Sequence, residues 1–92
     1  MPQTRLHVFV HGNVQGVFFR SSTRDFARAL SLKGWVRNLP DGSVEAVFEG
    51  EKKNVGRVLE YLKKGPPGSS VSRVNARQED YKGEFESFDI IY

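Results

Sequence analysis

Two hydrophobic periods alternate along this chain, and their order constrains its fold more than any other feature. Apolar residues occupy every second position of residues 4–12, which predicts a strand with one buried face. From about Ser21 they recur at i, i+3 and i+4, which predicts a helix that ends near Gly34. Ser22 and Asp25 have capping-box spacing at its start. The apolar positions are Leu6, Val8 and Val10 in the strand and Phe26, Ala29 and Leu30 in the helix.

The remainder of the chain repeats this alternation. Residues 34–39 and 43–50 have strand patterns on either side of a Pro-Asp-Gly turn, so they predict a hairpin. A second helix is expected over residues 52–64, because Gly65 and the two prolines after it stop a helix. One or two closing strands are then expected within residues 70–78 and 85–92.

This order, β-α-β-β-α-β with a possible extra C-terminal strand, predicts an α+β fold of the ferredoxin-like type. That fold is a sandwich in which an antiparallel sheet carries both helices on one face. The 92 residues suffice for one domain, residues 1–92, with one core. The first two strands should run parallel with the third between them, so their carboxyl ends share one edge about 10 Å apart. Residues 12–20 follow one of these ends and Asn38 lies at the other.

The loop at residues 12–20 reads GNVQGVFFR and offers no nucleophile or metal cluster. Gly12 and Gly16 permit backbone conformations that aim successive N–H groups into one concavity, and the following helix adds its dipole. Arg20 ends the loop with a planar fork that suits two phosphate oxygens. Spacing alone leaves open that the glycines only turn the chain and that Arg20 is a surface charge. The loop is neither a Walker A sequence nor a G-x-G-x-x-G fingerprint.

Two motifs together resemble the signatures of a known family. GNVQGVFFR, followed by GWVRN and DGSVE, is similar to the acylphosphatase patterns G-x-V-Q-G-V-x-F-R and G-x-V-x-N-x-x-D/x-G-x-V. The resemblance continues through KKGPPGSSVSRV to a terminal FDIIY of the family's F-x-I-x-Y type. It implies a single acylphosphatase-like domain: a hydrolase that cleaves the carboxyl-phosphate bond of acyl phosphates, with no metal and no cofactor.

The resemblance also implies a role for individual residues. Arg20 matches the family's phosphate-binding arginine, and Asn38 matches the asparagine that orients the attacking water. Many acylphosphatases have Thr or Ser after that asparagine, whereas this chain has Leu39 and then Pro40. The second shell around Asn38 therefore departs from the family pattern. The backbone amides that match the family's phosphate-binding loop are those of Gln15, Gly16, Val17, Phe18 and Phe19.

The chemistry of the substrate agrees with these residue types. An acyl phosphate already has a good leaving group, a carboxylate, so positioning and charge stabilisation can carry the reaction. The amide of Asn38 can hold a water in line but is too weak a base to ionise it. We therefore expect the proton of the water to pass to a phosphoryl oxygen or to leave late.

The expected partners are an acyl phosphate and inorganic phosphate, the latter as product or competitive ligand. Lys and Arg number 14 against 11 Asp and Glu, a net charge of +3 that is spread along the chain. This predicts a solvated basic surface and no nucleic-acid partner. The sequence has no cysteine, no signal-peptide pattern and no apolar run long enough for a bilayer. We expect a cytoplasmic monomer without a membrane partner.

Other features of the sequence suggest different sites or functions. His7 and His11 would lie roughly 13 Å apart on a strand, so they are poor joint metal ligands. Residues 21–23 carry hydroxyls without an evident base, which favours helix capping over nucleophilic catalysis. A module of the same fold could bind phosphate or carbamoyl phosphate without catalysis. An RNA-recognition module is disfavoured, since Glu45 and Glu49 on a central strand would repel phosphate.

Overall fold

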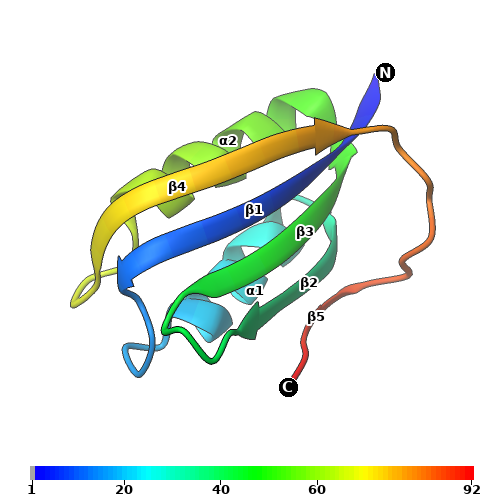
Figure 1. Cartoon of the computed structure of the whole chain (residues 1–92). Helices are drawn as coiled ribbons and strands as arrows, with labels where there is room; N and C mark the ends of the chain where they lie inside the picture. Colours follow the sequence, from blue (N-terminus) through cyan, green and yellow to red (C-terminus); the bar gives the residue numbers. More distant parts are fainter. Residues whose placement is uncertain (1) are drawn as a thin grey trace.

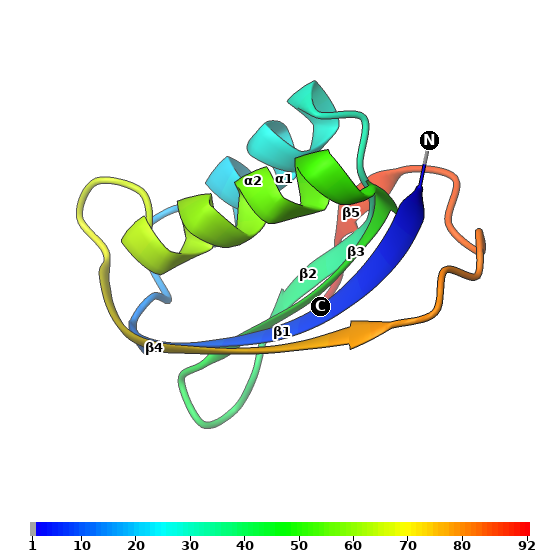
Figure 2. The ribbon, with the colours of Figure 1, turned by 90° about the horizontal axis from the view of Figure 1, so that it is seen from above.

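The computed structural model describes residues 2–92, in which two helices pack on one face of a five-stranded sheet (Figure 1). Figure 2 shows both helices lying side by side on that face. In chain order the elements are β1 (Gln3–Asn13), α1 (Phe19–Ala29), β2 (Lys33–Asn38), β3 (Val44–Glu51), α2 (Lys52–Lys64), β4 (Ser70–Glu79) and β5 (Phe88–Ile90).

The strands lie in the order β4-β1-β3-β2-β5, which confirms the ferredoxin-like fold. Strand β3 is antiparallel to both β1 and β2, so these two run parallel with β3 between them, as predicted. The extra C-terminal strand, β5, pairs parallel with β2, and the sheet is therefore mixed. The carboxyl ends of β1 and β2 meet at one edge of the sheet, which positions the loop after β1 beside the end of β2 (Figure 1).

The core lies between the sheet and the two helices. Alternate residues of the central strands point into it, and each fully buried aliphatic side chain stabilises the fold by about 1.5–3 kcal/mol. Helix α2 has the predicted bounds, and its buried residues lie on one face. The main contributors are Leu6, Val8 and Val10 from β1, Ala46 and Phe48 from β3, and Val55, Val58 and Leu62 from α2.

Helix α1 begins at Phe19 rather than near Ser21. Phe18, the residue before it, has a left-handed backbone (φ 58°, ψ 25°), and its carbonyl accepts the N–H of Ser22 at 3.0 Å. Ser22 therefore lies inside the first turn, where it cannot cap the helix. The predicted capping box with Asp25 is wrong, because α1 has no side-chain cap and no acidic residue in its first turn.

Helix α1 ends at Ala29 rather than near Gly34. Ser31 adopts a left-handed conformation (φ 58°), and the N–H of Leu32 donates to the Ala27 carbonyl at 2.9 Å. This reversal buries Leu32 and lets β2 begin immediately. The predicted apolar stripe is wrong at Ala29, which is exposed, because the face that meets the core contains Ala27 instead.

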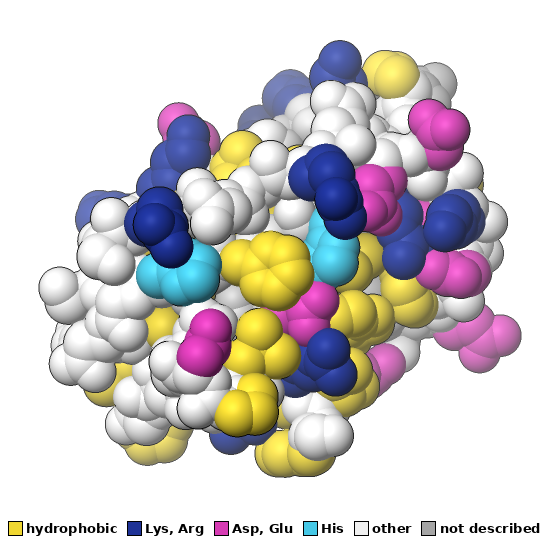
Figure 3. Space-filling view, in the orientation of Figure 1, with side chains coloured by type: hydrophobic (Ala, Val, Ile, Leu, Met, Phe, Trp, Pro, Cys, Tyr) yellow, Lys and Arg dark blue, Asp and Glu magenta, His cyan; other side chains and the backbone are white. Residues whose placement is uncertain are grey.

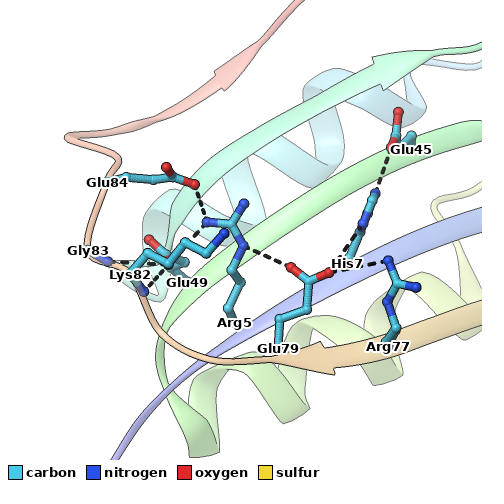
Figure 4. A network of polar contacts seen from close by, with 9 residues as sticks. All are labelled: Arg5, His7, Glu45, Glu49, Arg77, Glu79, Lys82, Gly83 and Glu84. Carbon is cyan, nitrogen blue, oxygen red and sulfur yellow. Dashed lines mark hydrogen bonds and ion pairs between the residues drawn. The ribbon is translucent and has the colours of Figure 1, made fainter.

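The segment after β4 crosses the end of the sheet and is tied to it by Glu49 (Figure 4). The buried Glu49 carboxylate accepts the backbone N–H groups of Lys82 at 2.8 Å and Gly83 at 3.3 Å. Arg5 donates to Glu49 at 3.4 Å and also to Glu84. These contacts direct the chain toward the free edge of β2, where β5 forms.

The open face of the sheet carries interleaved acidic and basic side chains around a small apolar area (Figure 3). Glu45 accepts hydrogen bonds from Arg37 at 2.7 Å and pairs with His7 at 2.6 Å. Burial opposes ionisation of Glu45, but the contacts with His7 and Arg37 outweigh it and lower the pKa of this carboxyl. Glu45 and Glu49 are both buried and paired with basic side chains, which offset the charge that they were expected to present to an RNA phosphate.

Two further observations apply to residues 2–92. No helix in this range is long and apolar enough to cross a membrane. No group of three or more His, Cys, Asp or Glu side chains in it is arranged to hold a metal ion.

Candidate functional site

A hollow of about 330 Å³ lies where β1 and β2 end, and five of the seven predicted site residues line it. Arg20 from the start of α1 and Asn38 from the end of β2 both line it. Gly16, Phe18 and Phe19 line the same hollow from the loop side. The two halves of the site are therefore adjacent in space although they are separated in the sequence by α1.

Two residues of the loop, Gly16 (φ 74°) and Phe18 (φ 58°), have positive φ angles. Left-handed residues of this kind occur in loops whose successive N–H groups form an anion-binding concavity. A Cβ at Gly16 would meet no atom within 4 Å, so conformation rather than space calls for glycine there. The same conformation at Phe18 costs about 1–2 kcal/mol, because its side chain has a Cβ.

The N-terminus of α1 is left without a side-chain cap. The predicted capping role of the hydroxyls at residues 21–23 is wrong for Ser21, whose Oγ donates to the Phe18 carbonyl at 3.1 Å. No first-turn N–H donates to this hydroxyl, because α1 has no side-chain cap hydrogen bond. Those N–H groups and the positive end of the helix dipole are free to interact with an anion.

Arg20 lies at this helix terminus and is partly buried. Its guanidinium carbon is 5.1 Å from the ring centroid of Tyr92, within the range of a cation–π contact. Within residues 2–92, no carboxylate lies at ion-pair distance from Arg20. The planar fork of hydrogen-bond donors is therefore available for an anionic ligand.

The C-terminal residues reach the site because β5 is anchored on both sides. The Phe88 ring is buried and stacks on Phe48, with ring centroids 5.1 Å apart. The N–H of Ile91 donates to the Val36 carbonyl of β2 at 2.9 Å. The last residue of the chain, Tyr92, is thereby brought next to Arg20, a contact that no local sequence pattern indicated.

Asn38 ends β2 and contributes an unsatisfied acceptor. Its Oδ1 atom is buried and accepts no hydrogen bond from any group of the described chain. A buried acceptor without a partner costs roughly 1–3 kcal/mol. Thr23 Oγ1 is also buried and has no hydrogen-bond partner within the described chain, but Thr23 does not line the hollow.

The side chain of Gln15 connects the loop to another part of the chain. Its Nε2 donates to the Leu39 carbonyl at 2.8 Å and to the Ser43 carbonyl at 2.9 Å. The loop is thereby tied to the β2–β3 turn, one residue beyond Asn38. Gln15 and Val17 do not line the hollow themselves, whereas the other three predicted loop residues do.

The β2–β3 turn has side-chain hydrogen bonds of its own next to its contacts with Gln15. Asp41 accepts the backbone N–H of Ser43 at 2.9 Å and its hydroxyl at 2.5 Å. These hydrogen bonds lower the pKa of Asp41 below its ordinary value. The predicted Pro-Asp-Gly turn is confirmed, and Leu39 contributes its backbone carbonyl to the contact with Gln15.

Comparison with known proteins identifies one family. A family model described as acylphosphatase matches residues 6–90. An acylphosphatase from Syntrophobacter fumaroxidans is 50% identical over 92 residues, which are 100% of this chain and 95% of the relative.

Solved structures agree. An acylphosphatase from Coxiella burnetii superposes with a TM-score of 0.92 at 43% identity and covers 97% of this chain and 93% of its own. An acylphosphatase from Bacillus subtilis superposes with a TM-score of 0.93 at 32% identity over 97% of this chain and 99% of its own.

Proposed function

Because this chain belongs to the acylphosphatase family, whose members hydrolyse acyl phosphates to a carboxylate and inorganic phosphate, we propose that the hollow between β1 and β2 is its active site. Arg20 and the backbone amides of residues 15–19 bind the phosphoryl group. Asn38 holds the attacking water. One observation carries this assignment: the loop, Arg20 and Asn38 line the same hollow from separate elements.

The proposed reaction is a direct displacement at phosphorus. The water oxygen forms a bond to phosphorus while the bond from phosphorus to the acyl oxygen breaks, and the electron pair leaves with the carboxylate. Arg20 and the loop amides stabilise the charge on the three phosphoryl oxygens, which is the main demand of phosphoryl transfer.

Asn38 positions the nucleophile without ionising it. The side-chain amide of Asn38, which lines the hollow, holds the water by a hydrogen bond and directs the water oxygen toward phosphorus. The displaced proton passes to a phosphoryl oxygen, since the carboxylate leaving group needs no strong general acid. A pH profile of turnover governed by a side chain that titrates near neutrality would contradict this mechanism.

We also propose that the enzyme works as a cytoplasmic monomer without a metal or cofactor. The charged, paired side chains on the open face of the sheet support the monomer, because burying them against a second copy costs desolvation (Figure 3).

The test is the loss of benzoyl phosphate over time, with EDTA present, on protein that sediments as one chain of 10.4 kDa. Hydrolysis should be rapid and unaffected by EDTA. Folded protein that binds inorganic phosphate but leaves benzoyl phosphate intact would be a binding module instead. Activity confined to a larger species would contradict the monomer.

Gln15→Ala should lower kcat about tenfold, because loosening the loop relative to Asn38 misplaces the water. Inorganic phosphate should still bind within about threefold of wild-type affinity, since the loop amides and Arg20 are retained. The matched control is Gln78→Ala, which removes a 3.0 Å glutamine hydrogen bond to Thr4 Oγ1, outside the hollow. Equal kcat values for the two variants would remove Gln15 from its positioning role.

A further inference from the structure

Phe18 is a large apolar side chain that the fold itself does not bury. It is 83% exposed, whereas the next residue, Phe19, is 2% exposed and anchors the loop in the core. Phe18 belongs to neither the core cluster nor the partly buried residues packed against it. It does line the active-site hollow, where an exposed phenyl ring can contact a ligand.

The backbone conformation at Phe18 disfavours phenylalanine, so the presence of this side chain needs an explanation. Its left-handed conformation is one that glycine or asparagine adopts with less strain than phenylalanine. The phosphoryl-binding loop needs the left-handed backbone, since that conformation orients its amides, but it has no use for a phenyl ring. A strained aromatic on the rim of a site is therefore better explained by a contact with substrate than by folding.

The acyl oxygen must leave on the side of phosphorus opposite the attacking water. Asn38, which holds the water, comes from β2, and Phe18 comes from the loop after β1, with β3 between these strands. Asn38 and Phe18 therefore line the hollow from different elements, which leaves space between them for a phosphoryl group and its acyl substituent.

We propose that Phe18 forms an acyl subsite that favours acyl phosphates with aromatic or large apolar acyl groups over acetyl phosphate. This inference rests on the proposed function and adds a substrate class to it. Ile90 and Tyr92 line the same hollow and extend its apolar surface. The ring of an aromatic acyl group packs on Phe18 in an offset or edge-on arrangement, an interaction that an acetyl group cannot make.

The experiment compares kcat/KM for benzoyl phosphate and for acetyl phosphate in wild type and Phe18→Asn. Asparagine accepts the left-handed backbone, so the variant should fold. The ratio of the two kcat/KM values should fall about fivefold, the size expected for losing one aromatic pair. Using the ratio cancels any common effect of the substitution on the phosphoryl-binding amides.

Two further variants sharpen the test. Phe18→Tyr keeps the ring and should keep the wild-type ratio. Tyr81→Asn removes an exposed aromatic outside the hollow and should also leave the ratio unchanged. An unchanged ratio in Phe18→Asn, or an equal loss for both substrates, would overturn the acyl subsite while leaving the proposed function intact. Failure of wild type to hydrolyse either substrate would overturn the proposed function, and the subsite with it.

Discussion

Arg20→Gln should reduce kcat/KM for benzoyl phosphate by about 10³-fold and weaken the binding of inorganic phosphate by roughly 10- to 100-fold. Both effects have the same cause. The guanidinium of Arg20 has no carboxylate partner among residues 2–92, so its charge-assisted hydrogen bonds are available to the phosphoryl oxygens. The loss for turnover is larger because the oxygens interact more strongly with Arg20 as charge spreads over them in the transition state.

The matched control for this prediction is Arg24→Gln. Arg24 lies one turn further along α1, pairs with Asp25 at 3.1 Å and does not line the hollow. Its exposed ion pair should contribute little to stability, so the control should retain activity and phosphate affinity. Titration calorimetry with inorganic phosphate and an assay with benzoyl phosphate measure the two quantities. Wild-type phosphate affinity in Arg20→Gln would exclude Arg20 from phosphoryl binding.

Asn38→Ala should lower kcat by about 10²–10³-fold while the affinity for inorganic phosphate stays within about twofold. In the proposed mechanism, the water that Asn38 holds takes part in the attack but not in binding phosphate in the ground state. This split separates Asn38 from Arg20, whose loss should affect both binding and turnover. The variant should not be less stable through the loss of Oδ1, because that atom makes no hydrogen bond within the described chain.

Asn75→Ala is the control for this second prediction. Asn75 lies exposed on β4, well apart from the hollow, and its closest polar contact is with His11 at 3.5 Å. Thermal unfolding of both variants establishes that they fold. A large loss of phosphate affinity in Asn38→Ala would show that Asn38 binds the phosphoryl group directly and would contradict the positioning of water.

Much of the fold could be predicted because each element is encoded by a local period. The alternation in residues 4–12 corresponds to strand β1, and the apolar stripe in residues 52–64 corresponds to helix α2. The right-handed crossover rule then places β1 and β2 parallel, with their carboxyl ends adjacent. The proximity of the loop to Asn38 follows from that topology, so it could be predicted without knowledge of any side-chain contact.

The bounds of α1 could not be predicted for a physical reason. Phe18 and Ser31 hold left-handed conformations that local propensity disfavours for residues with a Cβ. Each is imposed by its surroundings: the loop turns at Phe18 to orient its amides, and the chain reverses at Ser31 to bury Leu32. Propensity rules assign such positions to the helix or its cap, and both bounds were therefore wrong.

By itself, the sequence determined the order of the elements, the family, and the groups available for chemistry: glycines that free the loop backbone, the charge of Arg20 and the amide of Asn38. These properties belong to single residues or to neighbours in the chain. Only the tertiary structure decided that the Gln15 side chain hydrogen-bonds to the β2–β3 turn and that Glu49 accepts a backbone N–H of the C-terminal segment. It also decided that Tyr92 lies against Arg20. Each of these contacts joins residues far apart in the sequence, and long-range packing sets which donor meets which acceptor.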